Sequence, residues 1–479
     1  MTNNFYNNFF NVVKNFPKKV ALEFHGISVT YLELDNSVRY LENNLIKLGL
    51  RKGDRIIVSI QKSLEYIYLY LSCLKSGVIF IPLNPEYSDS EFNYFIDDCN
   101  PKMIVFDEKT IRQTTHNKIL IGELSQDNKE PQIIKGSSVV SEKDPAVFIY
   151  TSGTTGKSKA AVISQKNILK NAADLIERWQ ISSFDSLLHV LPLFHVHGLF
   201  VGLNTILLSG GTILIKRNFS VKETIEDLSK CSLFMGVPTI YKRLVESDIL
   251  NTENTKKTRL LISGSAPMSV DLHEKIYSKT GHKILERYGM SEAGMITSNY
   301  IDKKKIGTVG VSLDSVEVRI MSDSEKIIGK NIVGNIEING HSVFNGYWNQ
   351  PEKNKESFTK DGWFKTGDMG YLDEDNFLTI SGRSKELIIT GGYNVYPKEV
   401  EDVLMQFQKV HDCAVVGRND HDLGEVIIAY IVLKENTGMD NLFTFLKDKL
   451  VKYKIPKEII KVEKIPRNAM GKIVRSDLK

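Results

Sequence analysis

The sequence has few cysteines, and their positions argue against a secreted or zinc-binding protein. Its 479 residues include four cysteines, which are far apart and show no Cys-x-x-Cys spacing: Cys73, Cys99, Cys231 and Cys413. A disulfide framework or a zinc ribbon needs closely spaced cysteines. We therefore expect buried free thiols in a reducing compartment and a cytoplasmic location.

The sequence also lacks an uninterrupted hydrophobic run long enough to span a membrane. Its most apolar segment, residues 187–208, is broken by three histidines, a proline and an asparagine. This segment predicts a buried helix or a strand pair that lines a cavity, and no membrane span. The N-terminus has no basic region followed by an apolar one, so it does not resemble a signal peptide.

Excess charge of one sign is absent as well. The 62 basic and 58 acidic side chains leave a net charge of +4, and lysines and acids are interspersed. This distribution indicates a solvated surface and no nucleic-acid partner. Small-molecule substrates are expected, and no feature suggests an obligate protein partner. The length predicts at least two domains.

Strand-like and helix-like segments alternate through the first three quarters of the chain. A helix is expected over residues 64–77, where Gly77 supplies a C-cap. Short apolar runs predict strands at residues 55–60, 78–83, 103–106, 146–149, 212–215, 233–236 and 260–263. This alternation predicts an α/β fold with buried parallel strands. Ligands in such folds bind at the carboxyl ends of the strands.

The pattern changes after about residue 310. A β-rich subdomain is expected from strands at residues 316–321 and 334–339, and a Gly-polar break follows at residues 379–385. Beyond the break, a helix and two strands predict a small α+β domain, at residues 395–407, 413–417 and 427–433.

The segment YTSGTTGKSKA at residues 150–160 is the strongest local signal for a ligand. It follows an apolar strand, and its glycines let the backbone N–H groups approach and bind an anion. A P-loop would need glycine at position 151, where this chain has Thr151, so that motif is excluded. An ordinary surface loop remains the alternative for this segment alone. The candidate polyphosphate ligands are Thr151, Ser152, Gly153, Thr154, Thr155, Gly156, Lys157 and Lys159.

Several further segments, taken with this loop, resemble the adenylate-forming superfamily of acyl-CoA synthetases, luciferases and peptide-synthetase adenylation domains. They are LPLFHVHG at 191, SGSAP at 263, ERYGMSE at 286, GYW at 346, GWFKTGD at 362, GRSKELI at 382 and PRNAMGK at 466. The resemblance implies a large N-terminal domain of layered α/β subdomains plus a β-rich subdomain, followed by a small mobile C-terminal α+β domain. The implied boundaries are residues 1–382, a hinge at 383–385, and residues 386–479.

The resemblance also implies a reaction in two halves. A carboxylate attacks the α-phosphorus of ATP and releases pyrophosphate, and the thiol of coenzyme A then displaces AMP. Glu292 is the expected Mg²⁺ ligand, since a carboxylate oxygen suits that ion. Tyr288 is expected against the adenine face, and Ser291 at the α-phosphate. The implied nucleotide-binding set is Gly264, Ser265, Ala266, Glu286, Tyr288, Gly289, Met290 and Ser291.

Other implied roles fall on three charged residues and one histidine. Asp368 would accept hydrogen bonds from the ribose hydroxyls, because a carboxylate has several acceptor sites. Arg383 would add a contact to the ribose or the phosphate. Lys472 would bridge the substrate carboxylate and the α-phosphate, and His195 would line their junction. Without the motifs, a surface lysine and an ordinary turn would be the simpler interpretations.

The resemblance places a hinge at Lys385. Rotation of the small domain about this hinge would withdraw Lys472 and bring the coenzyme A contacts Gly391, Gly392 and Tyr393 to the site. His197 is either a core or a pocket histidine. A metal site at His195 and His197 is disfavoured, because no third ligand has suitable spacing.

Two arginines suggest which acid is activated. Arg287 and Arg243 occur where the acyl pocket is expected, and the motifs are similar to the malonyl-CoA synthetase branch. The second carboxylate of malonate needs a cationic partner when it is buried. Methylmalonate is expected as a second substrate. The alternative is that both arginines form salt bridges within their own domain, with Glu286 and Glu246.

Other functions stay open at this point. The chain departs from its relatives at Ala160, Gln165 and Asn335, and Ala160 is expected to stiffen the phosphate loop. One alternative is a CoA synthetase for another short carboxylic acid. Another is a non-catalytic paralogue that only binds nucleotide. A carrier-protein thiol as acceptor in place of coenzyme A is a further possibility.

Overall fold

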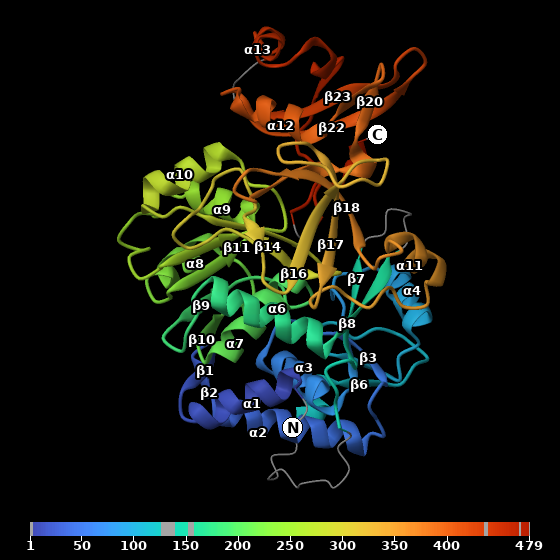
Figure 1. Ribbon diagram of the computed structural model, residues 1–479. Helices are drawn as coiled ribbons and strands as arrows, with labels where there is room; N and C mark the ends of the chain where they lie inside the picture. The colour runs from blue at the N-terminus through green and yellow to red at the C-terminus, as the bar shows by residue number, and fades with distance from the viewer. Residues whose placement is uncertain (1–2, 126–138, 152–157, 435–438, 469–470, 479) are drawn as a thin grey trace.

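The structure is a computed structural model that describes residues 3–125, 139–151, 158–434, 439–468 and 471–478. It has a large N-terminal domain of two α/β layers and a β-rich subdomain, and a small C-terminal α+β domain above them (Figure 1). The predicted fold class is therefore confirmed. Within these residues, no helix has both the length and the apolar character needed to cross a bilayer.

The larger of two mainly parallel sheets has nine strands in the order β15-β14-β13-β12-β11-β9-β10-β1-β2. Its strands are β1 (Val20–Phe24), β2 (Ile27–Thr30), β9 (Ser186–His189), β10 (Thr212–Ile215), β11 (Leu233–Gly236), β12 (Leu260–Ser263), β13 (Leu285–Met290), β14 (Gly294–Ser298) and β15 (Val311–Ser312). The pairs from β1 to β13 along this order are parallel, whereas β2, β14 and β15 pair antiparallel at the two edges.

The second sheet has six strands in the order β6-β5-β3-β4-β7-β8. They are β3 (Arg55–Ser59), β4 (Ile79–Pro82), β5 (Met103–Phe106), β6 (Lys118–Leu120), β7 (Pro145–Thr151) and β8 (Lys159–Ser164). Only β7 and β8 pair antiparallel, with Thr151 opposite Lys159. This hairpin brings together the two ends of the predicted phosphate loop.

Helices fill the space between the two sheets and cover their outer faces (Figure 1). The inner helices share one core with both sheets: α1 (Phe5–Asn15), α2 (Tyr31–Lys47), α3 (Leu64–Ser76), α5 (Ile121–Ser125), α6 (Gln165–Arg178), the π-helix at His197–Asn204 and α7 (Thr205–Ser209). The outer helices are α8 (Val221–Leu228), α9 (Pro238–Val245) and α10 (Val270–Thr280) on the nine-stranded sheet, and α4 (Asp89–Cys99) on the six-stranded one.

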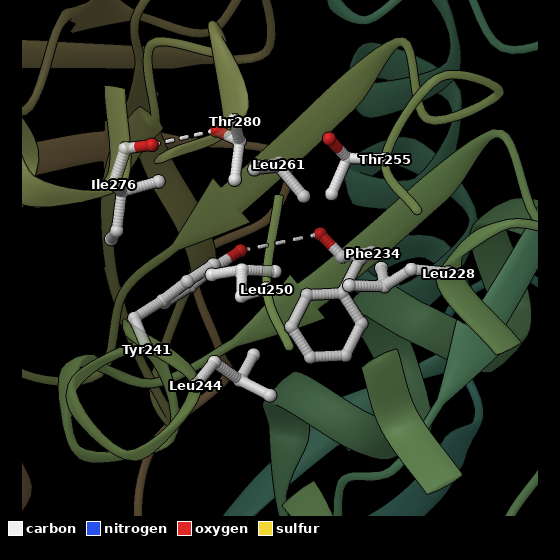
Figure 2. Close-up of a pocket in the computed structure, with 9 residues that line it drawn as sticks. All are labelled: Leu228, Phe234, Tyr241, Leu244, Leu250, Thr255, Leu261, Ile276 and Thr280. Atoms are coloured by element: carbon white, nitrogen blue, oxygen red, sulfur yellow. Dashed lines mark hydrogen bonds between the residues drawn. The ribbon is translucent and has the colours of Figure 1, made fainter. Parts of the chain in front are cut away.

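The parallel strands are apolar on both faces because both faces are covered. In β11, Leu233 and Met235 point to the inner core, and Phe234 points to the outer core under α8–α10. Figure 2 shows a small apolar pocket in this outer core, where the hydroxyl of Tyr241 on α9 faces the carbonyl of Phe234. The same hydroxyl donates to the carbonyl of Ile262 at 2.8 Å. The pocket is part of the packing that anchors α9.

The remaining two sheets are mainly antiparallel. The β-rich subdomain contains β16 (Val316–Met321), β17 (Gly334–Gly340), β18 (Phe364–Leu372) and β19 (Leu378–Arg383), with α11 (Pro351–Ser357) beside them. The C-terminal domain contains β20 (Ile388–Thr390), β21 (Tyr393–Val395), β22 (Val410–Asp420), β23 (Gly424–Leu433), β24 (Glu458–Lys461), α12 (Pro397–Gln406), α13 (Leu442–Lys449) and short 3-10 turns at Ser384–Glu386, Lys452–Lys454 and Arg475–Leu478.

The local predictions agree closely with these elements. The strands expected from short apolar runs are present, and α3 ends at Gly77, which has a left-handed φ of 77°. The four cysteines are buried and free, as expected. The segment at 187–208 contains a strand and then helix, in which the π-helix was not predicted.

Candidate active site

Arg287 lies on β13 and is buried against the turn that follows the neighbouring parallel strand, β12. β12 and β13 pair in parallel, so the turn after β12 lies next to Arg287 on β13. The guanidinium rests flat on Gly264, where an added Cβ would lie 2.4 Å from Cζ. A side chain at position 264 would therefore displace the guanidinium. The arginine itself is 3% exposed.

The charge of Arg287 is not neutralised by any carboxylate among the described residues. Its Nε and Nη2 atoms are buried and have no hydrogen-bond partner in this part of the chain. The neighbouring Glu286 contacts His273 on α10, at 2.8 Å from Nε2, and so does not pair with Arg287. Burial lowers the pKa of Arg287 to about 9. An unpaired buried cation is costly, and an anionic ligand group would relieve that cost.

His197 lies beside this arginine, at the start of the π-helix. It is 2% exposed, and its Nδ1 is 3.3 Å from Oγ of Ser265. Burial, and then the charge of Arg287, lowers the pKa of His197 well below its usual value, so the imidazole is neutral. Its Nε2 is buried without a partner among the described residues. Ser265 has a left-handed φ of 69°, which places strain in this turn.

A second cluster forms on the β-rich subdomain around Asp368. Asp368 on β18 lies opposite Arg383 on β19 in register, and Nε of Arg383 is 3.1 Å from Oδ1. The phenol of Tyr288 donates to Oδ2 at 2.5 Å. The two carboxylate oxygens of Asp368 thus contact Arg383 and Tyr288, respectively. This arrangement suits recognition of paired hydroxyl groups.

Glu292, just after β13, is a buried carboxylate close to this cluster. Its Oε1 accepts a hydrogen bond of 2.9 Å from the phenol of Tyr347. Burial raises the pKa of Glu292, and the bond from Tyr347 opposes that shift. Nζ of Lys159 lies 5.9 Å from the centre of the Tyr347 ring. A carboxylate has several acceptor sites, so Glu292 can accept from Tyr347 and still hold a hard cation such as Mg²⁺.

Lys472 reaches the site from the far end of the chain. A turn closed by Asn468 holds its backbone, and Gly471 packs against Thr239 on α9, where an added Cβ would lie 2.9 Å from Oγ1. Lys472 as a whole is exposed, but burial of its ammonium end, followed by the charge of Arg383, lowers its pKa, whereas Asp368 and Glu292 raise it. The ammonium group is therefore within electrostatic range of Arg383, Asp368 and Glu292.

His195 is also within electrostatic range of the Lys472 ammonium group. Burial, and then the charge of Lys472, lowers the pKa of His195 to about 4, so its imidazole is neutral near pH 7. Its Nε2 is buried and has no partner among the described residues. Residues from three distant parts of the sequence, at 195, 287–292 and 472, therefore surround one site at the carboxyl ends of the parallel strands.

Comparison with known proteins agrees with this geometry. A family model described as AMP-binding enzyme matches residues 9–348, and one described as AMP-binding enzyme C-terminal domain matches residues 399–472. The chain belongs to the AMP-binding enzyme family. The resemblance to adenylate-forming enzymes is therefore confirmed.

Individual relatives of this AMP-binding enzyme act on different acids. The malonate–CoA ligase of Arabidopsis thaliana is 32% identical over 98% of this chain and 87% of its own length. The long-chain-fatty-acid–CoA ligase of Bacillus subtilis is 31% identical over 97% of this chain and 92% of its own. ATP-bound MatB from Rhodopseudomonas palustris is 35% identical over 100% of this chain and 98% of its own, with a TM-score of 0.95.

Some predicted site residues of this AMP-binding enzyme lie away from the cluster. Arg243 is exposed on α9 and forms no ion pair among the described residues, with Glu246 or otherwise. Gly391 and Gly392 form an exposed turn between β20 and β21, and Tyr393 stacks on Tyr453 of the same domain. Lys385 is exposed in the 3-10 turn Ser384–Glu386.

Of the other predicted site residues, some are half-buried at the ends of two strands and some lie outside the described residues. Ser265, Ala266, Tyr288, Gly289, Met290 and Ser291 are half-buried at the ends of β12 and β13. Ser152, Gly153, Thr154, Thr155, Gly156 and Lys157 lie outside the described residues. Tyr347 was not assigned a role from the sequence, although it belongs to the quoted GYW motif. The presence of Tyr347 in a shared motif was the signal that could have identified it.

Proposed function

We propose that this enzyme joins malonate to coenzyme A through an acyl-adenylate, using ATP and releasing AMP and pyrophosphate. The observation that carries the proposal is the buried guanidinium of Arg287, which has no counter-charge among the described residues. The free carboxylate of malonate would supply that charge. Methylmalonate differs by one methyl group, which discriminates by only about 1–3 kcal/mol, so it is the second proposed substrate.

Other acids fit this site less well. The similarity to a long-chain-fatty-acid–CoA ligase is nearly as high as that to a malonate–CoA ligase. An alkyl chain, however, would leave the Arg287 charge buried and unpaired, and a lost charge-assisted hydrogen bond costs about 1.5–3 kcal/mol. Arg243 is exposed, and we assign to it only a screened attraction for the same anion.

The nucleotide would lie across the cluster at Asp368. Asp368 would accept hydrogen bonds from the ribose hydroxyls, with Tyr288 and Arg383 beside it. Glu292 would hold Mg²⁺, which neutralises developing phosphate charge when it is bound. Gly264, Ser265 and Ala266 would flank the adenine, and the phosphate loop from Thr151 to Lys159 would hold the β- and γ-phosphates.

Lys472 and His195 act at the reacting atoms in this proposal. One malonate oxygen attacks the α-phosphorus, the bond to the β-phosphate oxygen breaks, and pyrophosphate leaves. The ammonium of Lys472 would stabilise the charge on both the attacking carboxylate and the α-phosphate. The neutral His195 would border the reacting groups and leave that positive charge to Lys472.

The second half-reaction would use a different orientation of the small domain. The thiol of coenzyme A attacks the acyl carbonyl, AMP leaves, and the thiol proton is released. We propose domains at residues 1–382 and 386–479 joined by a hinge at 383–385, with Gly391, Gly392 and Tyr393 contacting coenzyme A after rotation. The four buried free cysteines support a reducing compartment, and we propose the cytoplasm.

A panel of carboxylic acids tests the proposal. AMP release is measured with ATP, Mg²⁺, coenzyme A and malonate, methylmalonate, succinate, acetate or butyrate. We expect malonate to give the highest kcat/KM. The Arg287→Leu variant should lower kcat/KM for malonate by 100-fold or more, which corresponds to about 2.7 kcal/mol.

The exposed Arg243 provides the matched control for this experiment. Arg243→Leu removes the same charge from a solvated position outside the cluster, so its effect should stay below tenfold. Equal use of butyrate and malonate by the unmodified enzyme, or an unchanged preference in Arg287→Leu, would disprove the proposed specificity.

A further inference from the structure

Lys62, in the turn between β3 and α3, is a buried lysine that the proposed reaction does not use. It is 8% exposed, and among the described residues it forms no ion pair with a carboxylate. Its Nζ lies 2.8 Å from Nδ1 of His189, 2.8 Å from the carbonyl oxygen of His189 and 2.9 Å from that of Leu191. Three acceptors match the three N–H bonds of an ammonium group.

The contact with Lys62 determines which nitrogen of His189 carries hydrogen. Burial, and then the charge of Lys62, lowers the pKa of His189 to about 3, so the ring is neutral. Since Nδ1 accepts from Lys62, Nε2 is the protonated nitrogen, and it donates to the carbonyl oxygen of Gly198 at 2.8 Å. Lys62 and Gly198 are thus joined through one imidazole.

Gly198 belongs to the first turn of the π-helix His197–Asn204. π-helices are rare, and their wide turns need support from surrounding contacts. Two glycines let this helix pack closely against its neighbours. An added Cβ at Gly202 would lie 2.9 Å from Cδ2 of His189, and one at Gly198 would lie 2.0 Å from the carbonyl oxygen of Pro192.

The same helical turn begins with His197, which contacts Ser265 and lies next to Arg287. We propose that Lys62 is a positioning residue for the acid-binding site: through His189 it holds the π-helix so that His197 stays against Ser265 and Arg287. Lys62 acts through these residues and does not touch the reacting atoms. The inference rests on the proposed function, since it assigns a support to the site that selects the acid.

Replacement of Lys62 tests this role. Lys62→Met keeps an unbranched side chain only one atom shorter and removes all three hydrogen bonds, which frees His189 to adopt the other tautomer. We expect the ratio of kcat/KM for malonate over butyrate to fall at least tenfold, through a higher KM for malonate. The KM for ATP should change less than twofold, because the cluster at Asp368 is not involved.

A double variant separates positioning from general loss of structure. In Lys62→Met/His189→Gln, the new side-chain amide can donate to Gly198 without help from Lys62, so at least threefold of the lost selectivity should return. Tyr6→Phe is the matched control, because it removes another buried hydrogen bond, to Asp35, far from this site. Tyr6→Phe should leave the malonate-over-butyrate ratio of kcat/KM unchanged, although its loss of thermal stability should be similar to that of Lys62→Met.

If Lys62→Met does not fold, Gly202→Ala is the alternative test, because it presses on the His189 ring and leaves Lys62 itself unchanged. It should lower the same ratio at least fivefold. A Lys62→Met or Gly202→Ala enzyme that is folded and keeps the ratio within twofold of normal would overturn the positioning role. Absence of any preference for malonate in the unmodified enzyme would instead overturn the proposed function.

Discussion

Buried charges decide the chemistry of this site residue by residue. Arg287 lacks a carboxylate partner among the described residues, whereas Asp368 and Arg383 form an ion pair with each other. Glu286 and Arg287 are adjacent in sequence but have separate roles, because His273 binds Glu286. The alternative interpretation, a salt bridge between these neighbours that would have left no charge for a substrate, is not found in the described part of the chain.

The protonation of a single residue, Lys472, predicts how activity depends on pH. Only the protonated amine can bridge the carboxylate and the α-phosphate. Burial lowers its pKa below the usual 10.5, so the charged form is lost as pH rises, and it is lost at a lower pH than for an ordinary lysine. We expect kcat/KM for ATP in pyrophosphate exchange to fall on the alkaline side before pH 10.5.

Two variants of Lys472 act as controls for that profile. Lys472→Arg keeps its charge at high pH, so the alkaline decline should disappear, although the rate itself falls. Lys472→Ala should abolish exchange, while acyl-adenylate supplied from outside still reacts with coenzyme A. The same alkaline decline in Lys472→Arg, or normal exchange in Lys472→Ala, would argue against a role at the α-phosphate.

At the scale of elements, the turn after β12 determines where Arg287 can lie. The backbone at Gly264 is covered by the guanidinium, and Ser265 takes a strained left-handed conformation beside His197. Parallel pairing of β12 and β13 creates this contact. A strand pair and the turn at Gly264 therefore position the arginine.

Gly264→Ala tests this arrangement. The added Cβ would meet the end of a flexible side chain, so we expect Arg287 to move while the fold survives. The KM for malonate should rise about tenfold or more, and the melting temperature should change by less than about 3 °C. Gly329→Ala is the control, because its Cβ would meet no atom within 4 Å. An unchanged KM in Gly264→Ala would show that the contact is unimportant.

Element prediction from the sequence succeeded where the hydrophobic signal was local. Strands such as β5 and β10 are short apolar runs with both faces buried, and their limits were predicted to the residue. The π-helix was not predicted because residues 197–204 are mostly apolar, with polar side chains only at the two ends, His197 and Asn204, and so show no helical period. Its geometry depends on contacts with His189 and Pro192, which lie outside the segment.

At the scale of the whole molecule, the C-terminal end of the chain reaches a site built mainly by the N-terminal domain. The turn with Gly471 rests on α9, and Nζ of Lys242 on the same helix donates to the carbonyl oxygen of His411 in the C-terminal domain at 3.0 Å. These contacts keep Lys472 within electrostatic range of Asp368 and Glu292. The turn at Gly391 and Gly392, in contrast, is exposed. This arrangement suits the first half-reaction.

Lys385→Pro tests whether the small domain must rotate for the second half-reaction. Proline restricts φ, so it should hinder rotation while leaving the present arrangement in place. We expect pyrophosphate exchange within about threefold of normal and thioester formation at least tenfold slower. Lys385→Ala removes the side chain without restricting the backbone and should retain both activities. Equal loss of both half-reactions in Lys385→Pro would contradict the hinge.

The sequence by itself determined the order of elements and the family, because both depend on local hydrophobic runs and on motifs of adjacent residues. It also identified Arg287, Asp368 and Lys472 as candidates. Only the tertiary structure decided that Arg287 is buried without a counter-charge, that Arg243 is exposed, and that Glu286 turns to His273. Burial and pairing are properties of contacts between distant segments, and these contacts arise only when the sheets and helices pack together.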